Sequence, residues 1–286
     1  MVRGGYFCTA GYTETGGMHA FLQKIAPDVE WQRCFPAVSK PAPKIGRPHA
    51  EPHERHAGAT GRRLIDAMLA QLREHVHGAA CNVDFVLLID DADCRFADAN
   101  DPSAEQVTWA NELAQRVRDA AGKPDLEFYA LLAWPEIEAW LLADWDNGFA
   151  MQYRQVAPSL RQHMATCVLS PHTWQEVEQF GGGLKAGSCA HKLSARIQQS
   201  FVDPTGCACR PPFLDRVTQR SDGARLAYSK RIDGAAMLKR IHPGRVAKDC
   251  PRFRSVYDQL RAAASSDRVT SDSIFVEQSA VSVQRK

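Results

Sequence analysis

The feature that most constrains the fold is an uninterrupted apolar run, Phe85-Val86-Leu87-Leu88-Ile89, that ends abruptly in Asp90-Asp91-Ala92-Asp93. An apolar run of this length without alternation is typical of a strand that is buried on both faces, as central strands of parallel sheets are. No apolar run approaches the roughly 20 residues that a membrane-spanning helix needs. The run therefore predicts a parallel sheet inside a soluble protein.

Strand and helix patterns alternate on both sides of this run. The sequence predicts strands at Tyr6–Ala10 and Leu126–Ala133, and helices after Gly11, at Arg62–His77, at Ala104–Ala121 and from Pro135 to Asp144. Such alternation is typical of a doubly wound, Rossmann-like α/β fold with a mostly parallel sheet flanked by helices.

The pattern loosens after Asn147, where Leu226–Ile241 and Phe253–Ala264 still indicate helices. We therefore expect an α/β domain at residues 1–148, a basic and mainly helical region at 149–264, and a polar, disordered tail at 265–286. The 9 cysteines are an odd number spread along the chain, which favours reduced thiols. With an N-terminus unlike a signal peptide, this predicts a cytoplasmic protein.

The net charge of +2 hides an uneven distribution. Between Asn82 and Asn147 there are 15 acidic and 4 basic residues, whereas between Lys185 and Arg261 there are 6 acidic and 16 basic residues. An acidic centre suits a metal cation, and a basic segment beside it suits a polyanion such as nucleic acid. The two segments could equally attract each other within one fold, and the sequence leaves both interpretations open.

Asp91 and Asp93 follow the central strand, at the edge of an open α/β sheet where ligands bind. Alternation along an extended backbone points both side chains the same way and turns Asp90 to the opposite side. Two carboxylates directed at one point predict a site for Mg²⁺ or Mn²⁺. The alternative is a solvated acidic loop that caps the following helix.

Two further carboxylates are expected at the same edge of the sheet. Glu138 follows the next strand in an apolar setting, where a carboxylate needs a partner such as a shared metal. Its position, and that of Glu136, near a helix N-terminus is also explained by the helix dipole. Glu14 follows a turn at Gly11, and it either reaches inward or lies in the first turn of a helix.

Three motifs together resemble the Toprim-like nucleases, which include the OLD-type and RloB-type defence nucleases. They are Ala10-Gly11-Tyr12-Thr13-Glu14, Asp91-Ala92-Asp93 and Pro135-Glu136-Ile137-Glu138-Ala139-Trp140-Leu141-Leu142. The chain is also similar to an uncharacterised bacterial Toprim-like family, through these motifs, Tyr228-Ser229-Lys230 and Cys250-Pro251-Arg252-Phe253.

The resemblance implies metal-assisted hydrolysis of nucleic-acid phosphodiester bonds in a bacterial defence system, with an AAA-type or ABC-type ATPase as partner. Asp91, Asp93 and Glu138 would hold Mg²⁺ or Mn²⁺, and Glu14 would join them as a catalytic residue. Lys192, Lys230 and Arg231 are the candidates for contacts with nucleic-acid phosphates. DNA, RNA and nucleotides all stay open as substrates, and so does a homo-oligomer.

One position departs from the Toprim-like pattern. The first glutamate of the turn, which in Toprim enzymes binds metal or acts as general base, is Ala10 in this chain. This departure favours an alternative, a catalytically impaired partner subunit of an AAA-type or ABC-type ATPase. A phosphatase or nucleotide-transferring enzyme with the same metal chemistry is a third interpretation, because a fold does not fix a reaction.

Overall fold

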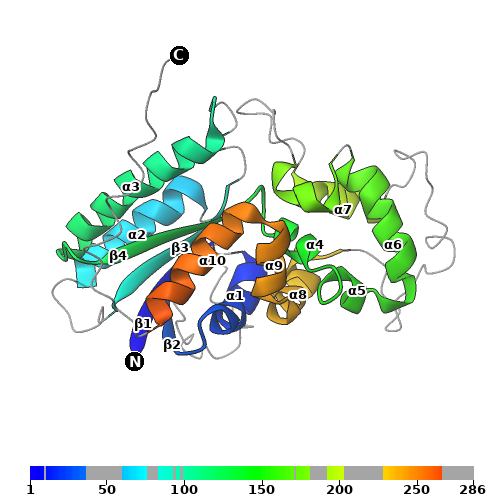
Figure 1. The fold of residues 1–286 in the computed structure, drawn as a ribbon. Helices are drawn as coiled ribbons and strands as arrows, with labels where there is room; N and C mark the ends of the chain where they lie inside the picture. Colours follow the sequence, from blue (N-terminus) through cyan, green and yellow to red (C-terminus); the bar gives the residue numbers. More distant parts are fainter. Residues whose placement is uncertain are drawn as a thin grey trace, which may run out of the picture.

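The protein is built around a parallel sheet. The computed structural model describes residues 1–9, 11–36, 60–75, 83–92, 95–96, 99–170, 172–180, 192–202 and 228–265. In these ranges the sheet has four strands, all parallel, in the order β2-β1-β3-β4 (Figure 1). The strands are β1 (Val2–Cys8), β2 (Val29–Phe35), β3 (Phe85–Asp91) and β4 (Glu127–Ala133). The predicted apolar run is the inner strand β3, which confirms the predicted fold class.

Helices cover both faces of the sheet (Figure 1). One face carries α2 (Gly61–His75) and α3 (Pro102–Ala121). The other face carries α1 (Tyr12–Ile25) and, from the far end of the chain, α10 (Pro251–Ala264). The helical segments between α3 and α10 are α4 (Glu138–Ala143), α5 (Phe149–Gln152), α6 (Ala157–His163), α7 (Leu193–Val202), α8 (Ala235–Arg240) and α9 (Pro243–Asp249), with 3₁₀ turns at Arg154–Val156 and Trp174–Gln179 and π-helical turns at Met164–Leu169 and Lys230–Gly234.

The buried strand β3 divides its side chains between two hydrophobic clusters. Phe85 and Leu87 pack on the side of α1 and α10, whereas Val86 and Leu88 pack on the side of α2 and α3. This alternation follows from the pleat of an extended strand. It explains why the run is apolar throughout, since each of its residues faces one covered side or the other.

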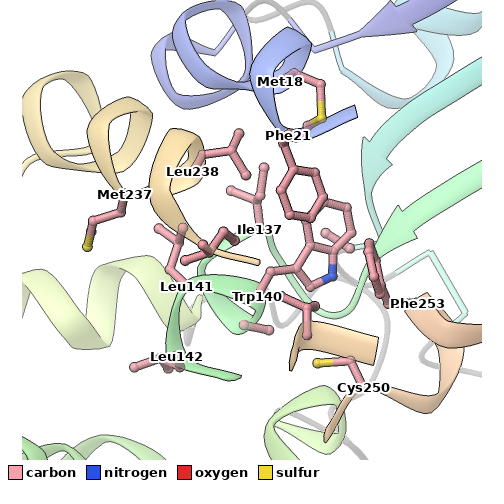
Figure 2. Close-up of a cluster of buried hydrophobic side chains, with 14 of the residues drawn as sticks. Met18, Phe21, Ile137, Trp140, Leu141, Leu142, Met237, Leu238, Cys250 and Phe253 are labelled. Atoms are coloured by element: carbon pink, nitrogen blue, oxygen red, sulfur yellow. The ribbon is translucent and has the colours of Figure 1, made fainter. Parts of the chain in front are cut away.

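The larger cluster joins the beginning and the end of the chain. The ring of Trp140 in α4 stacks on Phe21 of α1 at 5.7 Å and meets Phe253 of α10 edge-on at 5.0 Å, both measured between ring centroids (Figure 2). All three rings are fully buried. Residues 1–148 and residues 149–264 therefore contribute to one continuous hydrophobic cluster.

Most predicted elements are present, with some corrections. The helix expected from Pro135 begins at Glu138, because Glu136 and Ile137 instead direct a carboxylate and an amide to other segments. The helix expected over Leu226–Ile241 is also wrong at its start, since Ser229 is extended and helical structure begins at Lys230. The strand β2 was not predicted. The tail after Ser265 lies outside the described residues.

Two other expectations concern cysteines and membranes. Cys8, Cys34 and Cys250 are buried, reduced thiols, as expected, but Cys167 is disulfide-bonded, contrary to the prediction of reduced thiols. Among the helices in the described ranges, none is long and apolar enough to cross a membrane.

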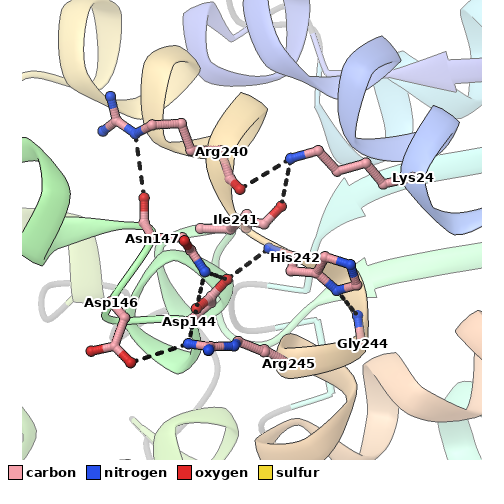
Figure 3. A network of polar contacts seen from close by, with 9 residues as sticks. All are labelled: Lys24, Asp144, Asp146, Asn147, Arg240, Ile241, His242, Gly244 and Arg245. Carbon is pink, nitrogen blue, oxygen red and sulfur yellow. Dashed lines mark hydrogen bonds and ion pairs between the residues drawn. The ribbon is translucent and has the colours of Figure 1, made fainter.

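A polar network fastens the C-terminal helices to the rest of the molecule (Figure 3). The buried carboxylate of Asp144 accepts a hydrogen bond from the backbone amide of His242 at 2.7 Å, just before α9 begins, and lies 3.5 Å from the guanidinium of Arg245. Lys24 of α1 donates to the backbone carbonyls of Arg240 at 3.0 Å and Ile241 at 3.1 Å, where α8 ends. Both contacts satisfy backbone groups that helix ends leave open.

We expect Asp144→Ala to lower the free energy of unfolding by about 2–3 kcal/mol, because it leaves the His242 amide and the Asn147 side-chain amide without their acceptor and removes the buried one of the two acidic partners of Arg245. The matched control is Asp146→Ala, which removes the exposed acidic partner of the same Arg245. The control should change stability by less than about 0.5 kcal/mol. Urea unfolding of both variants measures the difference, and equal losses would contradict the anchoring role of Asp144.

Candidate functional site

The acidic residues gather where the strand order reverses. The chain places β2 on one side of β1 and then crosses to place β3 on the other side, so β1 and β3 flank the switch point of the sheet. In open α/β sheets, ligands bind outside the carboxyl ends of the strands at this point. Glu14 follows β1, Asp91 ends β3, and Glu136 and Glu138 follow β4.

Glu14 is buried in the first turn of α1. Its carboxylate folds back over Gly11, and a side chain at position 11 would collide with the Oε2 atom of Glu14. Burial, together with the charge of Glu138, raises the pKa of Glu14 to about 7. The turn needs a small residue at Gly11, and Glu14 reaches inward rather than into solvent.

Asp91 lies beside the segment that leads into α4. Its Oδ1 atom accepts a hydrogen bond from the backbone amide of Ile137 at 2.9 Å. Burial raises the pKa of Asp91 well above its ordinary value, and the charges of Glu14 and Glu138 raise it further. Asp91 is therefore close to both glutamates.

Asp90 faces the opposite side of the sheet, as expected from the alternation. Its carboxylate accepts hydrogen bonds from the hydroxyl of Thr60 and the amide of Gly61, both at 2.9 Å, and from the guanidinium of Arg95 at 2.6 Å. These partners satisfy the carboxylate within the face covered by α2. Asp90 is thus a structural residue of that face and is separate from the acidic group around Asp91.

Glu136 and Glu138 are both buried and receive different partners. The Oε1 atom of Glu138 accepts a hydrogen bond from the hydroxyl of Tyr228 at 2.8 Å. Its Oε2 atom is buried and has no hydrogen-bond partner among the described residues. Burial raises the pKa of Glu138. Glu136 is better satisfied, because it accepts from the amide of Ser194 at 2.8 Å and from the Ser194 hydroxyl at 2.9 Å.

The ammonium of Lys230 contacts both of these glutamates. Its Nζ atom lies 3.2 Å from Glu136 Oε1 and 3.3 Å from Glu138 Oε1. Burial disfavours the charged ammonium, but the surrounding carboxylates outweigh it and raise the pKa of Lys230 above its ordinary value. The backbone carbonyl of Lys230 accepts a hydrogen bond from Thr13 at 3.1 Å, which fixes this turn against the start of α1.

The carboxylate oxygens of the acidic centre are suitable ligands for a divalent cation, although they are not arranged to coordinate one. In the described part of the chain, the charges of Glu14, Asp91, Glu136 and Glu138 all act on the ammonium of Lys230, and one buried oxygen of Glu138 has no hydrogen-bond partner. Hard divalent cations bind carboxylate oxygens of this kind. Within the described ranges, however, no three acidic, histidine or cysteine side chains already stand in a geometry that could hold one ion. Binding would require these side chains to rearrange around the ion.

The structure brings together most of the residues selected from the sequence. Glu14, Asp91, Glu138 and Lys230 meet at one end of the sheet, and the exposed Arg231 lies at its rim. Lys192 is exposed just before α7, two residues from the Ser194 that holds Glu136. Asp93 and Ala10 lie outside the described residues.

Two partners of the acidic group were not predicted as site residues. Tyr228 had been singled out only as part of the Tyr228-Ser229-Lys230 motif, and Ser194 not at all. Each donates to a glutamate that lies far away in the sequence, with 90 positions between Tyr228 and Glu138 and 58 between Ser194 and Glu136. The resemblance at residues 228–230 was the available signal for Tyr228, and the sequence holds no comparable signal for Ser194.

The fold and the site define an α/β protein with a buried acidic centre at the switch point of a parallel sheet. The chain belongs to the family described as "Domain of unknown function (DUF4276)", which matches residues 11–261 and so includes Glu14, Asp91, Glu136, Glu138 and Lys230. Neither a curated protein nor a solved structure matches the chain.

We expect opposite effects from removing the cation and removing one negative charge. Lys230→Met should lower the free energy of unfolding by about 3 kcal/mol, because it leaves two buried carboxylates without their cation. Glu138→Gln keeps the shape and an acceptor for Tyr228 but removes a buried charge, so its stability should equal or exceed that of the wild type.

Thermal unfolding in the presence of EDTA measures both effects without bound metal. Lys239→Met is the matched control, since Lys239 is exposed on α8. A Glu138→Gln variant as unstable as Lys230→Met would mean that the charge of Glu138 stabilises the fold and that the centre is a structural ion pair.

Proposed function

We propose that the protein is a Mg²⁺-dependent or Mn²⁺-dependent nuclease of the Toprim-like type that hydrolyses phosphodiester bonds of nucleic acid. The observation that carries the proposal is the buried, unpartnered oxygen of Glu138 beside Asp91 and Glu14. A fold that buries several like charges together at a ligand-binding edge keeps an arrangement that costs stability, which is typical of functional sites.

Asp91 and Glu138, with Asp93 from the same motif, are the residues that would hold the metal. A bound divalent ion would supply charge neutralisation at the phosphate and a more acidic water. The chain's own contribution begins with Tyr228 and the Ile137 amide, which orient the carboxylates of Glu138 and Asp91. Such outer partners fix ligand geometry in metal sites.

Glu14 is the candidate for moving the proton. Its carboxylate is buried beside Glu138, and burial makes it a stronger base than a solvated carboxylate. It also belongs to the turn in which the resemblance expects a catalytic glutamate. We therefore assign to Glu14 the role that Ala10 cannot perform.

The basic residues around the centre would bind the substrate backbone. Lys230 keeps 37% of its side chain exposed beside the glutamates, and it is our first candidate for a phosphate contact. Lys192 and Arg231 are exposed on neighbouring segments. Phosphate contacts of this kind position nucleic acid without reading its sequence.

In this proposal the protein works in the cytoplasm, and an AAA-type or ABC-type ATPase is its partner.

The test is metal binding and cleavage by purified protein. Calorimetry should detect binding of Mn²⁺ to the wild type. The wild type should also cleave labelled DNA or RNA in the presence of Mg²⁺ or Mn²⁺. Asp91→Asn and Glu138→Gln should weaken Mn²⁺ binding at least about tenfold. Glu14→Gln should reduce cleavage by about 10²–10⁴-fold while Mn²⁺ binding changes less. Asp146→Asn, an exposed carboxylate outside the centre, is the control.

The alternative, a catalytically impaired partner subunit, makes a different prediction. It is favoured by Ala10 and by the contacts of Lys230 with the carboxylates, which leave no ready-made set of three metal ligands among the described residues. In that case wild type and Glu14→Gln would both be inert with every metal, and Asp91→Asn would leave the cellular function intact.

A further inference from the structure

An exposed aromatic ring and an exposed arginine meet at the rim of the acidic centre. The guanidinium of Arg231 lies 5.0 Å from the centroid of the Tyr12 ring. Tyr12 is the first residue of α1, two positions before Glu14, and Arg231 directly follows Lys230. The pair therefore adjoins the centre from two sides, through residues that already belong to it.

The pair is unusual because it is exposed. Tyr12 keeps 37% of its surface accessible and the neighbouring Ile232 keeps 59%, although most large apolar residues of the described chain are buried. The hydrogen bond from Thr13 to the carbonyl of Lys230 holds the two segments together, so the ring and the guanidinium are presented by a fixed backbone. The ring and the guanidinium are therefore accessible at a fixed position beside the centre.

We propose that Tyr12 and Arg231 form a stacking platform for an unpaired nucleobase next to the acidic centre, so that the preferred substrate is single-stranded or locally unpaired nucleic acid. This inference rests on the proposed function and names its substrate class. Bases of single strands stack on aromatic rings and on guanidinium planes, whereas bases in a duplex are not available to them.

Charge and size favour a nucleobase over a protein partner. The ammonium of Lys230 turns inward to the glutamates although 37% of its side chain is exposed, and the next residue, Arg231, turns outward to the ring. One strand could therefore place a phosphate and a base on successive residues. The platform consists of Tyr12, Arg231 and the adjacent Ile232. This is far smaller than the roughly 800 Å² that each partner buries in a stable protein interface.

The test is fluorescence anisotropy of the full-length protein with a labelled oligonucleotide of about 16 nucleotides. The probe is used single-stranded and as a duplex, in EDTA so that nothing is cleaved. Tyr12→Ala should raise the Kd for the single strand about tenfold, and Tyr12→Phe should change it less than about twofold, because the ring is kept. Duplex binding should change little in both variants.

Arg231→Lys separates stacking from charge. It keeps the positive charge but loses the planar group, so it should weaken single-strand binding while the dependence of Kd on salt stays the same. The control is Val107→Ala, which removes an exposed apolar side chain from α3 on the other side of the sheet. Circular dichroism of each variant confirms that the fold is retained.

The outcomes separate this inference from the nuclease proposal. Unchanged single-strand binding in Tyr12→Ala, or equal losses for single strand and duplex, would overturn the platform even if cleavage is found. The platform would also fall if the wild type bound neither form or if the surface proved to bind a protein instead. Tyr12-dependent binding without any metal-dependent cleavage would support the platform and overturn the nuclease.

Discussion

The ammonium of Lys230 is the contact on which the arrangement of the molecule depends. Glu136 and Glu138 are carried into a buried position by the segment that follows β4, and buried carboxylates are costly unless a cation accompanies them. Lys230 comes from the C-terminal region, and its turn is held by Thr13 of α1 and by Tyr228. One ammonium thus joins the sheet, the first helix and the C-terminal helices. Without Lys230, the carboxylates of Glu136 and Glu138 would remain buried without a compensating charge.

The acidic centre is stable only because the apolar core around it is extensive. The packed rings of Phe21, Trp140 and Phe253 lie on α1 and α4, which also carry Glu14 and Glu138, and on α10. Burial of large rings contributes several kcal/mol, which offsets the cost of gathering like charges nearby. The core therefore compensates for the unpartnered oxygen of Glu138 and the unfavourable surroundings of Asp91, but it does not remove them. Functional centres typically retain such local conflicts.

The sequence predicted those parts that depend on local pattern. The buried strand β3, the helices α2 and α3, and the opposite orientation of Asp90 and Asp91 all follow from periodicity, and the structure contains them. The edge strand β2 was missed although Glu30 and Gln32 alternate with Val29 and Trp31, a period-two pattern that indicates a strand covered on one face. The predicted helix start at Pro135 was wrong, because Glu136 accepts hydrogen bonds from Ser194 and the amide of Ile137 donates to Asp91. Pairing of Lys230 with Glu136 spans 94 positions, and no local rule predicts such a contact.

That long separation has a consequence for synthesis of the protein. At about 5–20 residues per second, a ribosome needs roughly 5–20 s to extend the chain from Glu136 to Lys230. During this interval the strands and the acidic segment have left the peptidyl-transferase centre, but the lysine that neutralises them does not yet exist. The carboxylates must therefore stay hydrated on the nascent chain, and the acidic centre at the ends of the strands can become buried only near the end of translation. A message truncated before the codon for Lys230 would yield a chain in which the acidic centre is never neutralised and buried.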